Sequence, residues 1–580
     1  MNLTDEQSNA VDLFKTSRAL KISAFAGTGK TSTLTAVAKS TSKSGVYLAF
    51  NKSVAYEAKA KFPQSVYCTT THSLAFRAVP DAYRGNAAKL TQSLHGNHVA
   101  QLLDIEEIAA GGVTLKPRSL GILTAKTVQR FCQSGDDELL VCHVPLSGKL
   151  DKIDPKYQEQ FKEYVSKLAA HLWDRMLDPG DDAPLGHDGY LKLWSLSKPQ
   201  LNYDYLLLDE AQDTNEAVLS VLRIQDSHLT LVGDRHQQIY EWRGAVNAMA
   251  TVETDAEALL TRSFRFGNSV ADAATSILKV LGEKRRVLGN PHRDTRITAT
   301  GMTQTILCRT NAGVVAMVVE ALTEGRRPHV VGGVNDLIRM LEDVGRLKRP
   351  IPAECSDFFG FKDWAEVVEF AQSDEGESLR SFVKIVSAHG EANLIQKLKS
   401  VAHDEAEADL TVSTGHKAKG REWDSVTLFS DFEPRTSKDN PARPVLNKEE
   451  ARLLYVATTR ARQLLVVPPR LAEKWNVPPA PPAVAIQVPA SPPPRILQKK
   501  PPPLLPAFAT VVKSPPTSVT APVAISTPTL SKAVPIPRNT ITSPTPTPML
   551  QPKQAEKMNR QSALQPSLMS SILSFFQGKK

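Results

Sequence analysis

Cysteine is scarce in this 580-residue sequence, and long apolar runs are missing. The five cysteines lie far apart, and no two of them have the spacing of metal ligands. This argues against a disulfide-stabilised secreted domain and favours a reduced intracellular compartment. No stretch approaches the roughly 18 uninterrupted apolar residues of a membrane span, and no apolar secretion signal opens the chain. We therefore expect an intracellular protein without a membrane partner, in the cytoplasm or nucleoid if bacterial or phage and in the nucleus if eukaryotic.

Acidic side chains are nearly absent from the C-terminal part of the chain. Residues 476–580 contain eleven Lys or Arg and one acid, Glu556, which is a net charge of +10. Because the whole chain carries +9, the rest of it sums to about −1. Any grip on DNA in the folded part must then come from local basic and polar contacts rather than from bulk charge.

The same C-terminal segment holds 23 of the 40 prolines. Proline lacks the amide donor and fixes φ, so such a stretch sustains neither helices nor central strands. Residues 476–568 are predicted to form a disordered, extended linker with polyproline character. The folded body is expected to end near Trp475.

Short apolar runs alternate with longer amphipathic segments in the rest of the chain. Strands are predicted at 20–25, 46–50, 205–208 and 229–232, and helices at 30–39 and about 53–61. Strand and helix in repeated order predict an α/β fold with parallel sheets. Residues 89–197 interrupt this order, are mostly helical in pattern, and are predicted to be an inserted domain rather than a loop.

A glycine-rich segment follows the first predicted strand and opens the first predicted helix. It consists of Ala24, Phe25, Ala26, Gly27, Thr28, Gly29, Lys30 and Thr31. Its glycines let successive backbone amides turn inward as an anion nest, and the helix N-terminus adds partial positive charge. In such a phosphate-binding loop Lys30 reaches the β- and γ-phosphates of ATP, and the Thr31 hydroxyl ligates Mg²⁺. The pattern usually begins with glycine, where this chain has Ala24.

Two acids, Asp209 and Glu210, stand at the carboxyl end of the predicted strand at 205–208. Asp209 is expected to hold Mg²⁺ through water, and Glu210 to polarise an attacking water as general base. Alone, such a pair would equally suit the first turn of a helix. The phosphate-binding loop upstream favours a nucleotide-hydrolysing site that uses ATP and Mg²⁺.

Seven further segments accompany the loop and the acidic pair in a fixed order, at 3–7, 47–52, 70–74, 233–245, 263–267, 414–423 and 455–462. Together these nine segments resemble the motifs of the UvrD/Rep family of superfamily-1 helicases, over residues 1 to about 470. The wording is most similar to that of the F-box DNA helicases and their shorter bacterial and phage relatives. The resemblance implies two RecA-like lobes, a DNA-stimulated ATPase with helicase activity, and single-stranded DNA and single-strand/duplex junctions as partners.

The resemblance also implies which residues hold the adenosine part of ATP. Gln7 would read the adenine edge, and Phe264 would sandwich the base. Glu422 would lie near the ribose.

At the γ-phosphate end, Gln237 would sense the phosphate, and Arg265 and Arg460 would reach it as arginine fingers. Charge on the transferred phosphoryl group spreads over its equatorial oxygens, and a cation there is worth roughly a thousandfold or more in rate. Because these arginines should lie across a cleft from Lys30, ATP binding should close the cleft and hydrolysis should reopen it.

DNA contacts are implied for residues of four motifs, namely Phe50, Asn51, Thr70, His72, Trp242, Arg243, Thr414 and His416. Trp242 would stack on a base. An aromatic face binds any base, so stacking supports movement that is independent of sequence. Many relatives carry phenylalanine where this chain has Thr71, so no stacking role is assigned there.

The resemblance implies interleaved domains. The first lobe would comprise 1–88 and 198–268 with the insertion 89–197, and the second lobe 269–335 and 405–470 with a reduced 2B-type insertion at 336–404. The wording fits the UvrD branch, which implies 3′→5′ movement.

Hydrophobicity returns at the extreme C-terminus, in residues 569–580. Ile572, Phe575 and Phe576 fall on one face of a single helical turn. The segment resembles a sliding-clamp-binding peptide, with Met569 where glutamine is usual. Another protein-docking peptide and a frayed apolar end are the alternatives.

Two other functions remain open from the sequence. One is a translocase that clears proteins from DNA with little unwinding, which the short 336–404 segment favours. The other is a catalytically weak, clamp-tethered DNA-binding protein. Relatives of that second kind lose the loop lysine or the acidic pair, whereas this chain keeps both.

Overall fold

The computed structural model describes residues 3–477 apart from 111–112, 147–153, 242–243, 352, 356–357, 359–360, 373–376 and 437–443. Trp242, Arg243, the proline-rich segment from Pro478 and the peptide at 569–580 therefore lie outside the described residues. Among the helices that are described, none has the length and apolar character needed to cross a membrane.

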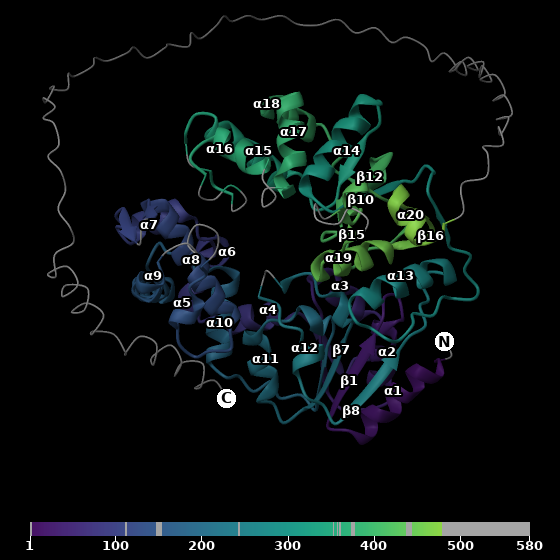
Figure 1. Cartoon of the computed structure of the whole chain (residues 1–580). Helices are drawn as coiled ribbons and strands as arrows, with labels where there is room; N and C mark the ends of the chain where they lie inside the picture. The colour runs from purple at the N-terminus through teal and green to yellow at the C-terminus, as the bar shows by residue number, and fades with distance from the viewer. Residues whose placement is uncertain are drawn as a thin grey trace, which may run out of the picture. The chain divides into compact units, whose positions relative to one another are not determined.

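Two six-stranded parallel sheets form the framework of the fold (Figure 1). The first has the strand order β3-β2-β6-β7-β1-β8. Its strands are β1 (Ala19–Ala24), β2 (Gly45–Leu48), β3 (Val66–Thr69), β6 (Tyr205–Leu208), β7 (His228–Gly233) and β8 (Ala256–Leu260). The four predicted strands of this region are confirmed, with ends shifted by one or two residues. The largest shift leaves Phe50 outside β2, in the turn that follows it.

The order of the strands brings two sequence motifs to one edge of the first sheet. β1 and β6 both pair in parallel with β7. The segments that follow β1 and β6 therefore emerge at the same edge, which is where parallel α/β sheets bind ligands. These segments are the glycine-rich loop and the acidic pair.

Both faces of the first sheet are covered at its centre, which explains why every residue of β2 and of β6 is buried. Tyr47 and Leu207 contact helices α1 (Asp5–Thr16), α2 (Lys30–Lys39) and α3 (Lys52–Lys59). Val46 and Leu206, on the opposite face, belong to the core of the 89–197 segment. That segment therefore shares a hydrophobic core with the sheet.

The inserted segment is mainly helical, as its pattern predicts. Its principal helices are α7 (Gly96–Leu102), α8 (Pro117–Gln133), α9 (Pro155–Leu177) and α10 (Gly186–Leu196), after the short α5 (Asp81–Arg84) and α6 (Ala87–Thr91). A short hairpin of β4 (Ile108–Ala110) and β5 (Val113–Leu115) was not expected from the sequence. Gly121 on α8 packs against the backbone of Gly96 on α7, so these two helices are in close contact.

The second sheet has the order β11-β12-β10-β13-β16-β9. Its strands are β9 (Arg296–Thr298), β10 (Thr305–Cys308), β11 (Pro328–Val330), β12 (Leu410–Thr414), β13 (Trp423–Leu428) and β16 (Ala461–Val466). One face packs on α13 (Asn268–Val280) and α19 (Lys448–Thr458). The other packs on α14 (Asn311–Thr323).

Four further helices extend the cover of the second sheet. They are α15 (Asn335–Leu347), α16 (Trp364–Gln372), α17 (Glu377–His389) and α18 (Glu391–Lys399). Leu341, Phe382 and Leu394 from these helices share one core with Leu410 and Val412 of β12. The last described helix, α20 (Pro469–Lys474), follows β16.

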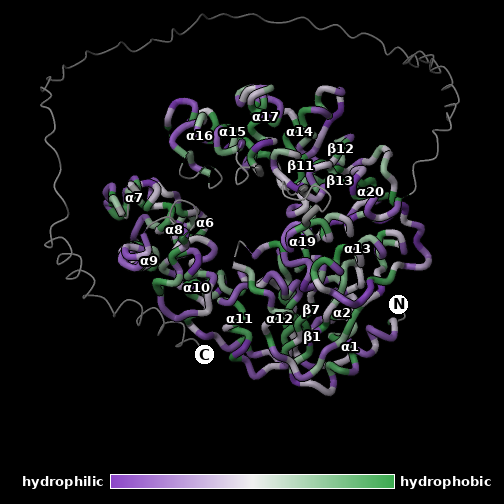
Figure 2. Tube along the Cα trace, in the orientation of Figure 1, coloured by the Kyte–Doolittle hydropathy of each residue, from purple (hydrophilic) through white to green (hydrophobic). Residues whose placement is uncertain are grey.

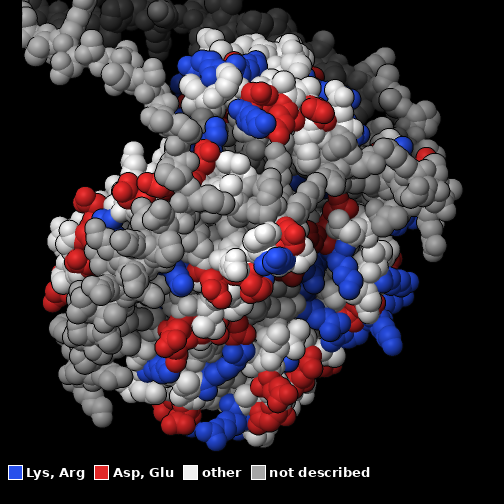
Figure 3. All heavy atoms as spheres, turned by 60° about the vertical axis from the view of Figure 1, so that its left-hand side comes forward, with Lys and Arg blue, Asp and Glu red and all other residues white. Residues whose placement is uncertain are grey.

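The helices are amphipathic, and the surface carries both signs of charge. Hydrophobic and hydrophilic stretches alternate along the helices, as expected for elements that cover a core on one side (Figure 2). On the face shown in Figure 3, acidic and basic side chains of the described residues are interleaved. This agrees with the net charge of about −1 outside the C-terminal segment.

Candidate active site

The glycine-rich loop between β1 and α2 forms a tight turn. Gly27 and Gly29 have φ values of 74° and 78°, in the left-handed region that favours glycine. The Thr28 hydroxyl donates to the carbonyl of Phe25 at 2.9 Å and closes the turn. A Cβ on Gly27 would overlap the Ser263 side chain, so the loop packs directly against the 263–267 segment.

Lys30, at the start of α2, reaches across the sheet edge to the acidic pair. Its Nζ lies 2.9 Å from Oε1 of Glu210. Burial acts to lower the pKa of Lys30, but the carboxylates of Glu210 and Asp209 outweigh it and raise that pKa. Burial likewise acts to raise the pKa of Glu210, but Lys30 and Lys419 hold it well below its usual value. Both groups are therefore charged at neutral pH.

Asp209 is buried beside two hydroxyl groups. Its Oδ2 accepts from the Tyr47 hydroxyl at 2.6 Å and from Thr31 Oγ1 at 3.5 Å. Burial and then the charge of Glu210 raise the pKa of Asp209. Adjacent hydroxyl and carboxylate oxygens are the hard donors that Mg²⁺ prefers. Thr31 and Asp209 thus fit the pair predicted to hold the metal.

Glu210 has a backbone conformation that is uncommon outside glycine, with φ of 51°. Residues in such conformations cost on the order of 1–3 kcal/mol and cluster at functional sites. The surrounding contacts over-determine this one, because Gln212 Nε2 donates to Glu210 Oε2 while Lys30 holds the other oxygen. Gln212 in turn accepts from the backbone amide of Asp234 at 3.1 Å.

A cavity of about 520 Å³ is lined by the glycine-rich loop and the acidic pair. Its other lining residues include Glu422 and Arg460, which lie next to strands of the second sheet. Of the predicted site residues, it is bordered by Gly27, Thr28, Gly29, Lys30, Thr31, Phe50, Asn51, Asp209, Glu210, Gln237, Phe264, Arg265, Glu422 and Arg460. Its volume is that of a ligand-binding site. The structure thereby brings together residues more than 400 positions apart in the sequence.

Arg460 follows α19 and is buried in this cavity. Its Nη2 donates to Oε1 of Gln237 at 3.3 Å, and its Nε donates to the carbonyl of Val456 at 2.8 Å. Burial and then repulsion from Arg265 lower the pKa of Arg460 to about 9. The guanidinium still carries charge at neutral pH, so two cations and Lys30 share one cavity. Three cationic side chains in one cavity favour a ligand with several negative charges.

Arg265 also contacts the second sheet and its helices. Its Nε forms an ion pair with Glu422, and its Nη1 donates to the carbonyl of Thr459 at 3.0 Å. Arg265 and Glu422 are therefore paired with each other at the cavity. Their predicted contacts, with the γ-phosphate and with the ribose, would require this ion pair to open.

Gln7 and Phe264 both lie next to Gly29, where each has a side-chain atom close to the position that a Cβ would take. Phe264 is half-exposed at the cavity. Gln7 is buried, with its amide oxygen accepting from the backbone of Thr4 at 3.1 Å and its amide nitrogen donating to Thr33 Oγ1 at 3.2 Å. One hydrogen and one lone pair of the Gln7 amide remain to read an adenine edge.

Two family descriptions match the chain. The UvrD/REP helicase N-terminal domain matches residues 3–256, and the UvrD-like helicase C-terminal domain matches residues 361–468. The chain belongs to the UvrD/Rep-like helicase family. The two sheets with their covering helices are the two RecA-like lobes of that family, called the first and the second lobe below.

Curated relatives of this family support the same assignment. F-box DNA helicase 1 of Gallus gallus is 34% identical over 509 residues, which are 80% of this chain and 49% of the relative. F-box DNA helicase protein 1 of Schizosaccharomyces pombe is 30% identical over 510 residues, 80% of this chain and 57% of the relative. ATP-dependent DNA helicase PcrA of Leuconostoc citreum is 33% identical over 97 residues, 15% of this chain and 13% of the relative. The chain spans about half the length of the two F-box relatives.

Lys419, in a UvrD-like motif of the second lobe, was not among the residues predicted for the site. Its Nζ forms ion pairs with Asp213 and with Glu210 Oε2, and it donates to the carbonyl of Gln237 at 3.0 Å. The contacts between the two lobes place this lysine in the cavity. Burial raises the pKa of Asp213 to about 6, although Lys419 opposes the shift.

Lys419 also lies close to aromatic residues of the motifs that are predicted to contact DNA. The rings of Phe50 and Tyr240 stack with their centroids 5.8 Å apart. Lys419 Nζ lies 5.9 Å and 5.7 Å from the two centroids, and the His416 ring lies 6.4 Å from Tyr240. Phe50 is 48% exposed, so the stack is open to solvent. Lys419 thus contacts Glu210 of the acidic pair and also lies next to the partly exposed stack of Phe50 and Tyr240.

Three other residues predicted to contact DNA cap local structure. Asn51 accepts from the backbone amide of Val54, and Thr70 accepts from that of Ser73 at the start of α4 (Thr71–Ala78). Thr414, at the end of β12, accepts from the backbone amide of Lys417. The caps at Asn51 and Thr70 stand at helix N-termini, where backbone amides favour an anion.

His72, on α4, is predicted to contact DNA and lies beside Tyr190, with an edge-to-face ring contact at 6.2 Å. Burial lowers the pKa of His72, so the ring is neutral at neutral pH.

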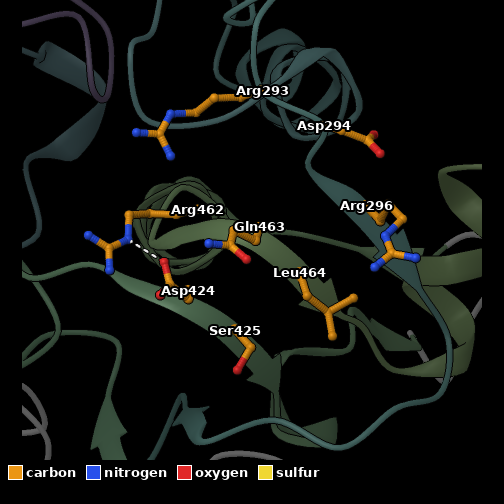
Figure 4. Close-up of a pocket in the computed structure, with 8 residues that line it drawn as sticks. All are labelled: Arg293, Asp294, Arg296, Asp424, Ser425, Arg462, Gln463 and Leu464. Carbon is orange, nitrogen blue, oxygen red and sulfur yellow. Dashed lines mark ion pairs between the residues drawn. The ribbon is translucent and has the colours of Figure 1, made fainter.

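A second hollow, of about 540 Å³, adjoins the cavity of about 520 Å³ and shares Arg293 with it (Figure 4). It is lined by β9, β13 and β16. Arg462 pairs with Asp424 at 2.8 Å, while Asp294 points away from the hollow in Figure 4. Arg293 and Arg462 therefore place positive charge in the hollow next to the cavity.

Proposed function

We propose that this chain is an ATP-dependent DNA helicase or single-stranded DNA translocase. One observation carries the proposal: Lys30 and the acidic pair of the first lobe share a single cavity with Arg460 of the second lobe and with Arg265 at their junction. ATP would bind between the lobes. The names of the F-box DNA helicases of chicken and fission yeast support DNA as the substrate.

The chain's own residues would supply the charges that phosphoryl transfer needs. Lys30 pairs with Glu210 in this arrangement, and the β- and γ-phosphates of ATP would take over that lysine. Glu210, held ionised by its surroundings, would then be left to orient an attacking water. Arg265 and Arg460 would neutralise charge that develops on the equatorial oxygens.

Mg²⁺ would be held by Thr31 and Asp209, whose oxygens lie 3.5 Å apart. When bound, the ion would neutralise charge on the β- and γ-phosphates. Gln7 and Phe264 would hold the adenine. Glu422 would contact the ribose once its ion pair with Arg265 has opened.

Movement along DNA would follow from opening and closing of the cavity. Phe50 belongs to the first lobe, whereas His416 and Lys419 belong to the second. Tyr240 contacts both sets of residues. Closure would therefore alter the grip on the bases that these rings contact. We expect Trp242 and Arg243, together with Asn51, Thr70, His72 and Thr414, to extend this contact along the strand.

We expect 3′→5′ movement, on the basis of the resemblance to the UvrD branch. A translocase that clears proteins with little unwinding is the second candidate. It is favoured by the 336–404 segment, because α15 to α18 share the core of the second lobe rather than forming a separate arm.

Strand displacement on 3′-tailed and 5′-tailed duplexes tests the proposal, with removal of streptavidin from biotinylated oligonucleotides run in parallel. Unwinding of the 3′-tailed duplex alone supports the helicase. Streptavidin removal without unwinding supports the second candidate. DNA binding without either activity would support a clamp-tethered binding protein and contradict both. Glu210→Gln is the matched control, because it keeps the shape of the side chain and removes the base.

The C-terminal peptide at 569–580, which lies outside the described residues, is proposed to bind a sliding clamp. A tethered peptide raises the local concentration of its partner without constraining the motor. Pull-down with dimeric and trimeric clamps, using the full chain and a chain lacking 569–580, tests this. Equal capture by both chains would contradict it.

A further inference from the structure

Tyr455 joins the two lobes at the phosphate-binding loop. It stands on α19 of the second lobe and is completely buried. Its hydroxyl accepts from the backbone amide of Ala26 at 3.0 Å and donates to Oδ2 of Asp234 at 2.8 Å. A phenol offers one donated hydrogen, and here both its donor and its acceptor role connect to the first lobe.

The Ala26 amide is a notable partner, because it belongs to the loop whose amides are expected to face the phosphates. Phe25 and Ala26 are packed in the same hydrophobic cluster as Leu453 and Val456 of α19. The loop therefore rests on a helix of the other lobe through apolar contacts and through this hydrogen bond. Residues of α19 therefore support the loop directly.

Asp234 extends the connection from Tyr455 to the cavity. The carboxylate also accepts from Gln237 Nε2 at 2.8 Å, and Gln237 accepts from Arg460 at 3.3 Å. Burial and the charge of Asp234 raise the pKa of Tyr455 far above its usual value, so its hydroxyl keeps its proton and remains a donor. An unbroken series of hydrogen bonds thus runs from the phosphate-binding loop to the arginine of the second lobe.

We infer that Tyr455 is a positioning residue, whose hydroxyl holds the phosphate-binding loop in its catalytic shape only while α19 is docked on the first lobe. This rests on the proposed function and deepens it. Docking of the second lobe then does two things at once: it brings Arg460 to the phosphates and it shapes the loop that holds them. Hydrolysis is thereby confined to the closed state.

Tyr455→Phe removes this hydroxyl and keeps the ring. Lys30 and the remaining loop amides still bind phosphate, so the KM for ATP should change by less than about threefold. Turnover at saturating ATP and single-stranded DNA should fall about tenfold, which corresponds to about 1.4 kcal/mol. The lower turnover at unchanged KM should persist when turnover is expressed per folded molecule, whereas a merely structural loss would lower only the folded fraction.

Two matched variants control for the loss of a buried hydroxyl. Tyr205→Phe, in β6, removes one that has no hydrogen-bond partner among the described residues. Tyr83→Phe, in α5, removes one that donates to the carbonyl of Leu177 in the insertion. Neither side chain lies in the site, so both variants should keep wild-type kcat and KM per folded molecule. Tyr83→Phe alone should lower the melting temperature.

Hydrogen exchange of the peptide that contains Ala26 tests the inference without relying on hydrolysis. Exchange there should be faster in Tyr455→Phe and unchanged in Tyr205→Phe. If wild type were inactive with DNA, the proposed function would fail, and exchange would still decide the role of Tyr455. An active wild type with equal kcat, KM and exchange in Tyr455→Phe would overturn the inference.

Discussion

Arg460 and Gln237 meet inside the cavity between the two lobes, with Nη2 of the arginine 3.3 Å from Oε1 of the glutamine. One residue comes from the second lobe and the other from the first. Their contact means that the arginine is already aimed at the position where the γ-phosphate is expected. The two lobes of this structure therefore meet across the cavity.

Arg460→Ala should abolish most DNA-stimulated hydrolysis. Loss of a cation at the transferred phosphoryl group is expected to lower kcat by about a thousandfold. Binding of a fluorescent ATP analogue should weaken by less than about threefold, since Lys30 and the loop remain. Arg470→Ala, a half-exposed arginine on α20 paired with Glu433, is the control. Turnover of Arg460→Ala close to that of the control would refute the assignment.

Lys419→Ala should uncouple hydrolysis from DNA. The lysine contacts both Glu210 and the Phe50–Tyr240 stack, so its loss removes the shortest physical link between them. The ratio of hydrolysis with single-stranded DNA to hydrolysis without it should fall at least about tenfold. Lys348→Ala removes a surface ion pair with Glu391 and should leave the ratio unchanged. Equal ratios in the two variants would contradict the coupling role.

The pKa of Asp213 predicts a pH-dependent stability. Its folded-state pKa is raised to about 6 by burial, so the folded protein holds this proton more tightly than the unfolded chain. The stabilisation is fully present below the unfolded pKa of about 3.9 and is lost as the pH rises through about 6. Asp213→Asn cannot titrate there. Between pH 4 and 7, urea midpoints of wild type should fall relative to those of Asp213→Asn; parallel curves would contradict the assigned shift.

Phe50→Ala should weaken binding of single-stranded DNA. Stacking of a base on an aromatic ring is worth about 1–3 kcal/mol, so affinity should fall by about five- to 150-fold. Because phenylalanine carries no charge, the salt dependence of binding should keep its slope. Tyr56→Ala, on α3, removes an aromatic side chain that is 76% exposed and serves as control. Fluorescence anisotropy with a labelled oligonucleotide measures both, and equal affinities would remove Phe50 from the DNA contact.

Gly121→Ala should destabilise the insertion. A Cβ there would overlap the carbonyl oxygen of Gly96, and the two helices have to move apart. Overpacking of this kind costs about 1–3 kcal/mol, which a melting curve detects. Gly85→Ala, where no atom lies within 4 Å of the new Cβ, is the control. Identical melting temperatures for both variants would contradict the close packing of α7 on α8.

The sequence was sufficient to predict the α/β fold class and the elements that carry the loop and the acidic pair. Those predictions rest on local patterns, since the apolar strand at 205–208 and the glycines before Lys30 each act within a few residues. The order of the six strands in each sheet could not be read in this way. Nor could the sharing of a core between Val46 and the insertion, which depends on packing across the chain.

The same limit applies to the candidate site. Lys30, Glu210 and Arg460 were predicted from their motifs, whereas Lys419 and Tyr455 acquire their contacts only when the lobes dock. Neither lysine nor tyrosine is unusual in a helicase motif or on a helix, so no residue type drew attention to them. Gln7 illustrates the converse, because its predicted partner is adenine while the structure gives its amide two partners within the protein.

ATP hydrolysis by the purified chain, measured with and without a single-stranded oligonucleotide, tests the central claim most directly. We predict at least about tenfold stimulation in wild type and no stimulated hydrolysis in Lys30→Ala. Absence of hydrolysis in wild type, or equal rates in wild type and Lys30→Ala, would contradict an ATP-driven motor built between these two lobes.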